Sequence, residues 1–224
     1  MTNENTAARA SSWPYFPFAM IMFSFLVKGA MFLFLNGPFI ILLLLGKSFN
    51  GFQNLFQEGI IPLLANAKGG ILSVSILVGA CTLIGFLVSP FERLTCVIAV
   101  GTVRICLPVL SRVGFKRHFF SPIDFRQEGA LNLEHWLVKN PAEKSYWEWG
   151  LLLYNLWWSM FFNISLSVIA LLLLIWPSLS WPVSTVLGLT WLLYLFFALD
   201  RSTAMAEVYA FYLKKACHKN RRDS

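Results

Sequence analysis

The chain has 224 residues, of which 57% are hydrophobic and only 13% are charged, and its mean hydropathy is +0.64. A soluble domain usually carries about 25% charged residues, so this composition excludes an ordinary soluble enzyme or binding domain. We interpret the net charge of +7 as a mark of membrane topology and expect no nucleic-acid partner.

Four apolar stretches are each about as long as the ~20 residues that a helix needs to cross a bilayer. They cover 16–46, 69–89, 150–176 and 182–199, and Lys28 is the one charged residue in them. Because lipid offers no hydrogen-bond partner to the backbone, such stretches must be helical. The sequence predicts an all-α integral membrane protein with four transmembrane helices and with amphipathic interfacial helices in its loops.

Residues 1–17 form a polar and then aromatic N-terminus, followed by a first crossing at 18–46. This crossing is longer than a ~30 Å hydrocarbon core requires. Either the helix tilts and kinks at Asn36-Gly37-Pro38, or residues 13–27 lie in the interface and the crossing starts near Lys28. The second alternative lets Lys28 reach the surface, whereas a functional intramembrane lysine would lack an acidic partner in the predicted spans.

The next segment, 47–68, is predicted to be an extracytoplasmic amphipathic loop. Its apolar residues recur at intervals of three and four, which is a helical pattern: Phe49, Phe52, Phe56, Ile60 and Leu63. Such a helix either caps the bundle or lies on the outer membrane face as a recognition surface. For the second case the candidate partner-binding residues are Gln53, Asn54, Gln57 and Glu58.

The second crossing, 69–89, places Ser75, Gly79 and Thr82 on one face, and we expect this face to pack against another helix. Ser89-Pro90 is predicted to end this helical span. Residues 94–110 are apolar but contain Arg104, and a fifth crossing would bury it at about 2.5–3.5 kcal/mol. We therefore favour a cytoplasmic or interfacial segment over a fifth crossing.

A basic cytoplasmic loop follows at 90–147, with a helix expected near 127–139 that ends at Asn140-Pro141. Its cations alternate with aromatic residues, as in segments that lie on anionic headgroups. Together with the C-terminal tail it supplies the candidate anionic-lipid contacts, which are Arg112, Lys116, Arg117, Lys214 and Lys215.

The third and fourth crossings, 150–176 and 182–199, form a tight hairpin. Aromatic residues that suit headgroup depth, among them Trp147 and Tyr154, open the third crossing. Asn155, Asn163 and Ser167 share one face of the third crossing, and we expect them to form interhelical hydrogen bonds. A basic cytoplasmic tail, 200–224, continues the last helix to about Lys215.

Positive charge is concentrated in two segments. Of the 18 Lys and Arg, eight lie in 90–147 and six in 200–224, which is fourteen together. The positive-inside rule places both segments in the cytoplasm, so with four crossings both termini are cytoplasmic. A bacterial inner membrane is the expected location.

No constellation of catalytic, cofactor-binding or metal-binding residues stands out. The four cysteines lack metal-ligand spacing and are expected to be free thiols. There is no HExxH, paired-carboxylate, nucleophile-elbow or phosphate-loop motif. Glu134 and His135 are adjacent on the expected helix, about 100° apart, and make a poor acid–base pair. The sequence therefore predicts a protein that is not an enzyme and has no cofactor.

The start of the chain, MTNENTAARASSWPYFPFAM, together with its size and layout, resembles the entry-exclusion inner-membrane proteins of conjugative plasmids. The resemblance carries over no functional residues. It implies a role in blocking redundant transfer by recognising a donor membrane protein of the conjugation apparatus. Related expectations are an accessory subunit of a conjugation or secretion apparatus and formation of a homo-oligomer.

Two alternatives from other classes stay open. An oligomeric channel or a toxin that depolarises membranes would cause growth arrest and membrane conductance. A membrane enzyme acting on lipids would use the loop at 112–139 and would depend on Glu134 or His135.

Overall fold

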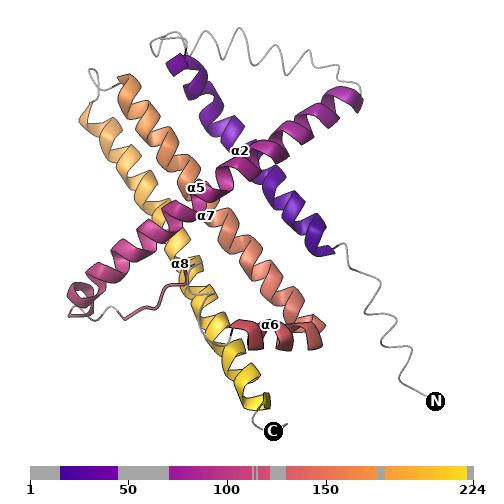
Figure 1. Ribbon diagram of the computed structural model, residues 1–224. Helices are drawn as coiled ribbons and strands as arrows, with labels where there is room; N and C mark the ends of the chain where they lie inside the picture. Colours follow the sequence, from indigo (N-terminus) through magenta and orange to yellow (C-terminus); the bar gives the residue numbers. More distant parts are fainter. Residues whose placement is uncertain are drawn as a thin grey trace. The chain divides into compact units, whose positions relative to one another are not determined.

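The computed structural model describes residues 16–44, 71–112, 114, 116–121, 130–175 and 180–220. Nearly all of these residues lie in helices, which are α2 (Phe16–Leu44), α5 (Ile71–Ser111), α6 (Ala130–Lys139), α7 (Pro141–Ile175) and α8 (Trp181–Asn220) (Figure 1). No strand occurs in these ranges. The prediction of an all-α protein is confirmed.

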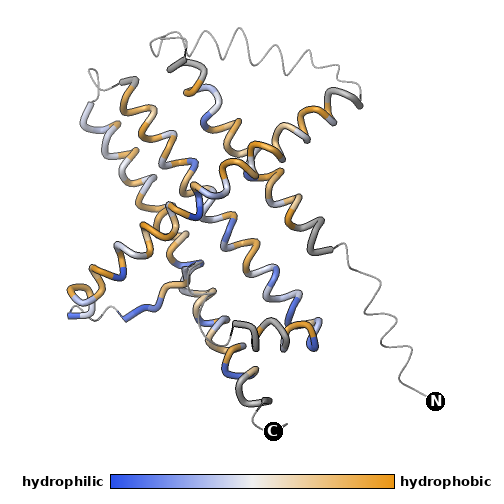
Figure 2. Tube along the Cα trace, in the orientation of Figure 1, coloured by the Kyte–Doolittle hydropathy of each residue, from blue (hydrophilic) through white to orange (hydrophobic). Residues whose placement is uncertain are grey.

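Within the described residues, four helices are long and apolar enough to cross a membrane: α2, α5, α7 and α8. Figure 2 shows hydrophobic residues along much of each of them. This is the pattern of a multi-pass membrane protein, because a helix that is apolar on most sides requires an apolar solvent. The predicted amphipathic loop, 47–68, lies outside the described residues.

Helix α2 is a single element with Pro38 inside it. Proline removes one backbone hydrogen bond, and membrane helices tolerate this loss when neighbouring helices supply other contacts. Residues 16–27 belong to the same helix as Lys28, so no helix break sets them apart as a separate interfacial segment.

Helix α5 corrects one sequence prediction and joins two segments that were predicted separately. It runs from Ile71 to Ser111 without interruption, so the predicted helix end at Ser89-Pro90 is wrong. The ambiguous segment 94–110 is the second half of this same helix, and much of the predicted 90–147 loop is helical. The physical reason is that a single proline in an apolar helix costs one hydrogen bond, while the surrounding residues continue to favour the helix.

The helix ends follow local chemistry. Gly114 adopts a φ of 86° just after α5, where glycine is the residue that best tolerates a left-handed conformation. Asn140 separates α6 from α7: its side-chain amide donates to the carbonyl of Trp136 at 2.7 Å, and its carbonyl accepts from the Lys144 amide at 3.0 Å. The predicted helix near 127–139, its end at Asn140-Pro141 and the extension of the last helix past Asp200 are confirmed.

The chain divides into two compact units. We call the first the network unit; it comprises Met22–Glu92 and Trp158–Phe196. We call the second the aromatic unit; it comprises Met1–Ile21, Arg93–Trp157 and Phe197–Ser224. Because α5, α7 and α8 are long, each contributes residues to both units.

The aromatic unit is built around buried rings. Phe120 packs edge-on against Tyr154 with ring centroids 5.3 Å apart and also contacts Tyr209. Trp147 contacts Tyr209 and Tyr212. The sequence placed Trp147 and Tyr154 among the residues at headgroup depth, but the structure buries both inside the unit. Aromatic rings supply large contact areas, and these pairings favour one arrangement of the unit.

Candidate functional site

An ion pair lies in the interior of the network unit. The Lys28 Nζ of α2 is 2.6 Å from Oε2 of Glu92 in α5, and the two side chains are 6% and 3% exposed. The prediction that Lys28 has no acidic partner is therefore wrong. Glu92 was assigned to a surface loop because Pro90 was expected to end the helix, whereas α5 carries Glu92 one turn beyond that expected end.

A third helix, α7, supplies a second partner for the Glu92 carboxylate. The hydroxyl of Ser159 in α7 donates to Glu92 Oε1 at 2.5 Å, so both carboxylate oxygens have a partner within the chain. Ser159 is fully buried. A charge-assisted hydrogen bond of this kind strengthens where water is excluded.

Amide groups extend the network along one face of α7, over about two helical turns. Asn163 Nδ2 donates to the Ser159 carbonyl at 2.8 Å, and Asn36 Nδ2 of α2 donates to Asn163 Oδ1 at 2.8 Å. The Ser167 hydroxyl donates to Asn36 Oδ1 at 3.0 Å. Residues 159, 163 and 167 are four apart, so one helix face presents all three. The predicted interhelical hydrogen bonds of Asn163 and Ser167 are confirmed.

Close contact between α2 and α5 brings the charged pair together. A Cβ added to Gly29 would overlap the Cys81 carbonyl, and one added to Gly85 would overlap the Phe25 carbonyl. Glycine permits the two backbones to touch, as small residues do at membrane helix crossings. Glu92 lies seven residues after Gly85, so both are on one face of α5, and Lys28 directly precedes Gly29 in α2.

The small-residue face predicted for packing was placed on the wrong side of α5. Ser75 is exposed, and a Cβ at Gly79 would have open space around it. The buried face of α5 carries Cys81, Gly85 and Glu92 instead. The 4- and 7-residue spacing of these three residues was visible in the sequence, but the expected helix end at Ser89-Pro90 separated Glu92 from the other two.

Helix lengths place the ion pair toward one end of the network unit. At 1.5 Å per residue, Glu92 is about 31 Å along α5 from Ile71, and Lys28 is about 24 Å along α2 from Leu44. A hydrocarbon core is about 30 Å thick. If helix ends 44 and 71 mark one membrane surface, the pair lies near the opposite surface, with Asn36 deeper by about 12 Å.

This arrangement is chemically suited to holding helices together. The ion pair balances the charges of Lys28 and Glu92, and the amides of Asn36 and Asn163 are hydrogen-bonded within the same network. A buried ion pair gives little net stability, but removing one partner leaves an uncompensated charge. The pair therefore specifies which faces of α2, α5 and α7 meet.

The predicted partner-binding residues Gln53, Asn54, Gln57 and Glu58 lie outside the described residues, as do the side chains of Glu134 and His135. The predicted anionic-lipid contacts are all exposed: Arg112, Lys116, Arg117, Lys214 and Lys215. Lys215 lies over the Phe211 ring, with its Nζ 4.5 Å from the centroid. Exposure is what a lipid contact requires, and the lipid assignment itself stays a prediction.

Three cysteines in the described part of the chain, Cys81, Cys96 and Cys106, are free thiols, as predicted. Cys96 Sγ is 2.9 Å from the Tyr154 hydroxyl.

No family model, curated protein or solved structure matches this chain. The functional argument therefore depends on the sequence and the geometry of the chain itself.

Proposed function

We propose that this chain is a multi-pass membrane protein that acts by binding another membrane protein, with its own helices held as a fixed scaffold. The observation that carries the proposal is the self-satisfied network of Lys28, Glu92, Ser159, Asn163 and Asn36. Groups that bond to one another inside a bundle stabilise one helix arrangement and leave the loops and outer faces for recognition.

Within this class, the concrete form we propose is plasmid entry exclusion or another accessory role in conjugation or secretion, at a bacterial inner membrane with both termini in the cytoplasm. Its support is the resemblance in size and layout, together with the concentration of cations in 90–147 and 200–224. The proposal includes no catalytic centre and no cofactor.

The test is site-specific photocrosslinking in intact cells. A photoreactive residue at Gln53 or Gln57 should capture a discrete membrane partner. With the photoreactive residue at one of these two positions, alanine at the other three of Gln53, Asn54, Gln57 and Glu58 should reduce capture by about tenfold, while alanine at Ser75, an exposed residue of α5, should leave it unchanged. Unreduced capture by a triple variant that inserts normally would contradict recognition through this loop.

A second candidate function is ion conduction, as an oligomeric channel or a membrane-depolarising toxin. Burial of Lys28 and Glu92 favours it, because ionisable residues inside membrane bundles often mark ion pathways. Proteoliposomes containing the protein would then show a conductance that the paired substitutions Lys28→Met and Glu92→Leu abolish. Absence of conductance, or conductance unaffected by the pair, would remove this candidate.

A further inference from the structure

A groove of about 370 Å³, lined by several charged residues, lies within the aromatic unit. Its volume falls in the range of small-ligand sites, about 300–1,000 Å³. The segment at 116–121 supplies Lys116, Arg117 and His118, and helix α8 supplies Asp200, Thr203 and Glu207. None of these residues belongs to the buried network described above.

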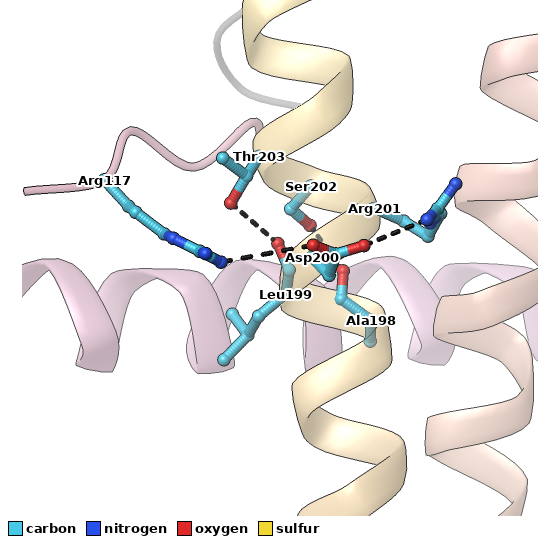
Figure 3. A network of polar contacts seen from close by, with 7 residues as sticks. All are labelled: Arg117, Ala198, Leu199, Asp200, Arg201, Ser202 and Thr203. Atoms are coloured by element: carbon cyan, nitrogen blue, oxygen red, sulfur yellow. Dashed lines mark hydrogen bonds and ion pairs between the residues drawn. The ribbon is translucent and has the colours of Figure 1, made fainter.

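The two walls of the groove are fixed to each other. The Phe120 amide donates to the Ser202 carbonyl of α8 at 3.0 Å, and Phe119 and Phe120 are buried. Arg104 also donates to the Phe119 carbonyl. On α8, residues 200, 203 and 207 recur at helical spacing and share one face. Figure 3 shows Arg117 reaching from the segment toward Asp200 on this face.

The groove carries charges of both signs. With histidine counted as neutral, Lys116 and Arg117 supply two positive charges, and Asp200 and Glu207 supply two negative charges. The closest approach between Arg117 and Asp200 is 4.0 Å, with both side chains partly exposed. Arg201, which does not line the groove, contacts Asp200 from the other side at 3.0 Å (Figure 3). Such a groove is complementary to a zwitterion and not to a purely anionic group.

The groove begins where an apolar helix run ends. Phe196-Phe197-Ala198-Leu199 directly precede Asp200 in α8, and the Phe197 ring contacts Trp157 with centroids 5.1 Å apart. Tryptophan is enriched at headgroup depth, and a membrane helix that changes from apolar to charged residues does so near that depth. This position favours a lipid headgroup over a soluble ligand.

We propose that the groove binds the phosphoethanolamine headgroup of a membrane phospholipid. The phosphate lies against Lys116 and Arg117, and the ammonium donates to Glu207 and Asp200. Lys116 and Arg117 were expected, together with Arg112, Lys214 and Lys215, to contact anionic lipids. The proposal differs from that expectation at Lys116 and Arg117, because Asp200 and Glu207 beside them disfavour a headgroup that lacks a cation. The inference holds whether or not the protein binds a membrane partner.

Native mass spectrometry of the detergent-purified full chain tests the site. The probes are phosphatidylethanolamine, phosphatidylglycerol and phosphatidylcholine with identical acyl chains. Phosphatidylethanolamine should bind at least threefold more tightly than the other two, since choline has no N–H to donate and the glycerol headgroup has no cation.

The variants test the assigned residues. Glu207→Gln should remove this preference, and Lys116→Gln should lower the affinity about threefold, as expected for a partly exposed ion pair. Glu143→Gln, an acidic position outside the groove lining, is the matched control and should keep the preference.

Equal binding of the three lipids by the native protein would overturn the proposal, as would a preference that survives Glu207→Gln. A final arm adds free phosphoethanolamine. The proposal expects no displacement of the lipid at millimolar concentration, because the acyl chains anchor the lipid beside the apolar end of α8. Displacement at low micromolar concentration would assign the groove to a soluble ligand and contradict the lipid assignment.

Discussion

The interiors of the network unit and the aromatic unit differ in their polar content, although both contain packed aromatic rings. Within the ranges of the network unit there are only three of the 18 Lys and Arg, yet it buries one of them against a glutamate and adds amide–amide bonds. The aromatic unit contains the other fifteen, leaves its described cations outside its core, and packs rings in that core.

The contrast has a physical basis. In lipid, the hydrophobic effect does not drive helices together, so close backbone contact and interior polar bonds must specify which faces meet. Where water reaches the surface, burial of large rings favours association, and charges can remain solvated. The manner of packing therefore supports the assignment of the network unit to an apolar solvent.

The largest effect on stability is expected when one residue of the Lys28–Glu92 ion pair is removed. Glu92→Leu leaves Lys28 without its buried partner and should lower the free energy of unfolding by about 3–5 kcal/mol. Unfolding in sodium dodecyl sulfate followed by circular dichroism measures this. The double variant Lys28→Met with Glu92→Leu removes both charges and should recover most of the loss. A single variant as stable as the native protein would show that the pair is not buried as described.

A smaller effect is expected at the helix crossing. Gly85→Ala places a methyl group on the Phe25 carbonyl and should cost about 2 kcal/mol, as overpacking of a close contact does. Gly79→Ala, on the same helix with open space around it, is the matched control and should change stability by less than about 0.5 kcal/mol. Equal effects at both positions would contradict the close approach of α2 and α5.

The smallest effect concerns the aromatic unit. Phe120→Leu keeps an apolar side chain but loses the ring contacts with Tyr154 and Tyr209, and it should cost about 1–2 kcal/mol. Near-ultraviolet circular dichroism should weaken as well, because ordered rings give that signal. Phe211→Leu, at a ring that is 55% exposed, should be close to neutral. A neutral Phe120→Leu would place this ring outside the core.

Sequence patterns predicted the helical class, the membrane-length helices and the short helix before Asn140, because these features follow from apolar run length and local breakers. They missed the Lys28–Glu92 pair because Pro90 was taken as a helix end. Local propensity does not show that contacts with neighbouring helices can compensate for the backbone hydrogen bond that a proline removes. They also placed the small-residue face of α5 on Ser75 and Gly79, since small residues occur on both sides of that helix. The burial of Trp147 and Tyr154 depends on long-range packing that no local pattern contains.

The most direct measurement of the central claim is thiol crosslinking in native membranes. With the four native cysteines replaced by serine, Lys28→Cys and Glu92→Cys are introduced together and treated with a bifunctional thiol reagent about as long as the two side chains that were removed. The structure predicts efficient intramolecular crosslinking for this pair and none for Lys28→Cys with Val74→Cys, since Val74 is exposed and lies about 27 Å along α5 from Glu92. Crosslinking of the Val74 pair, with none of the Glu92 pair, would contradict the buried ion pair and the scaffold built on it.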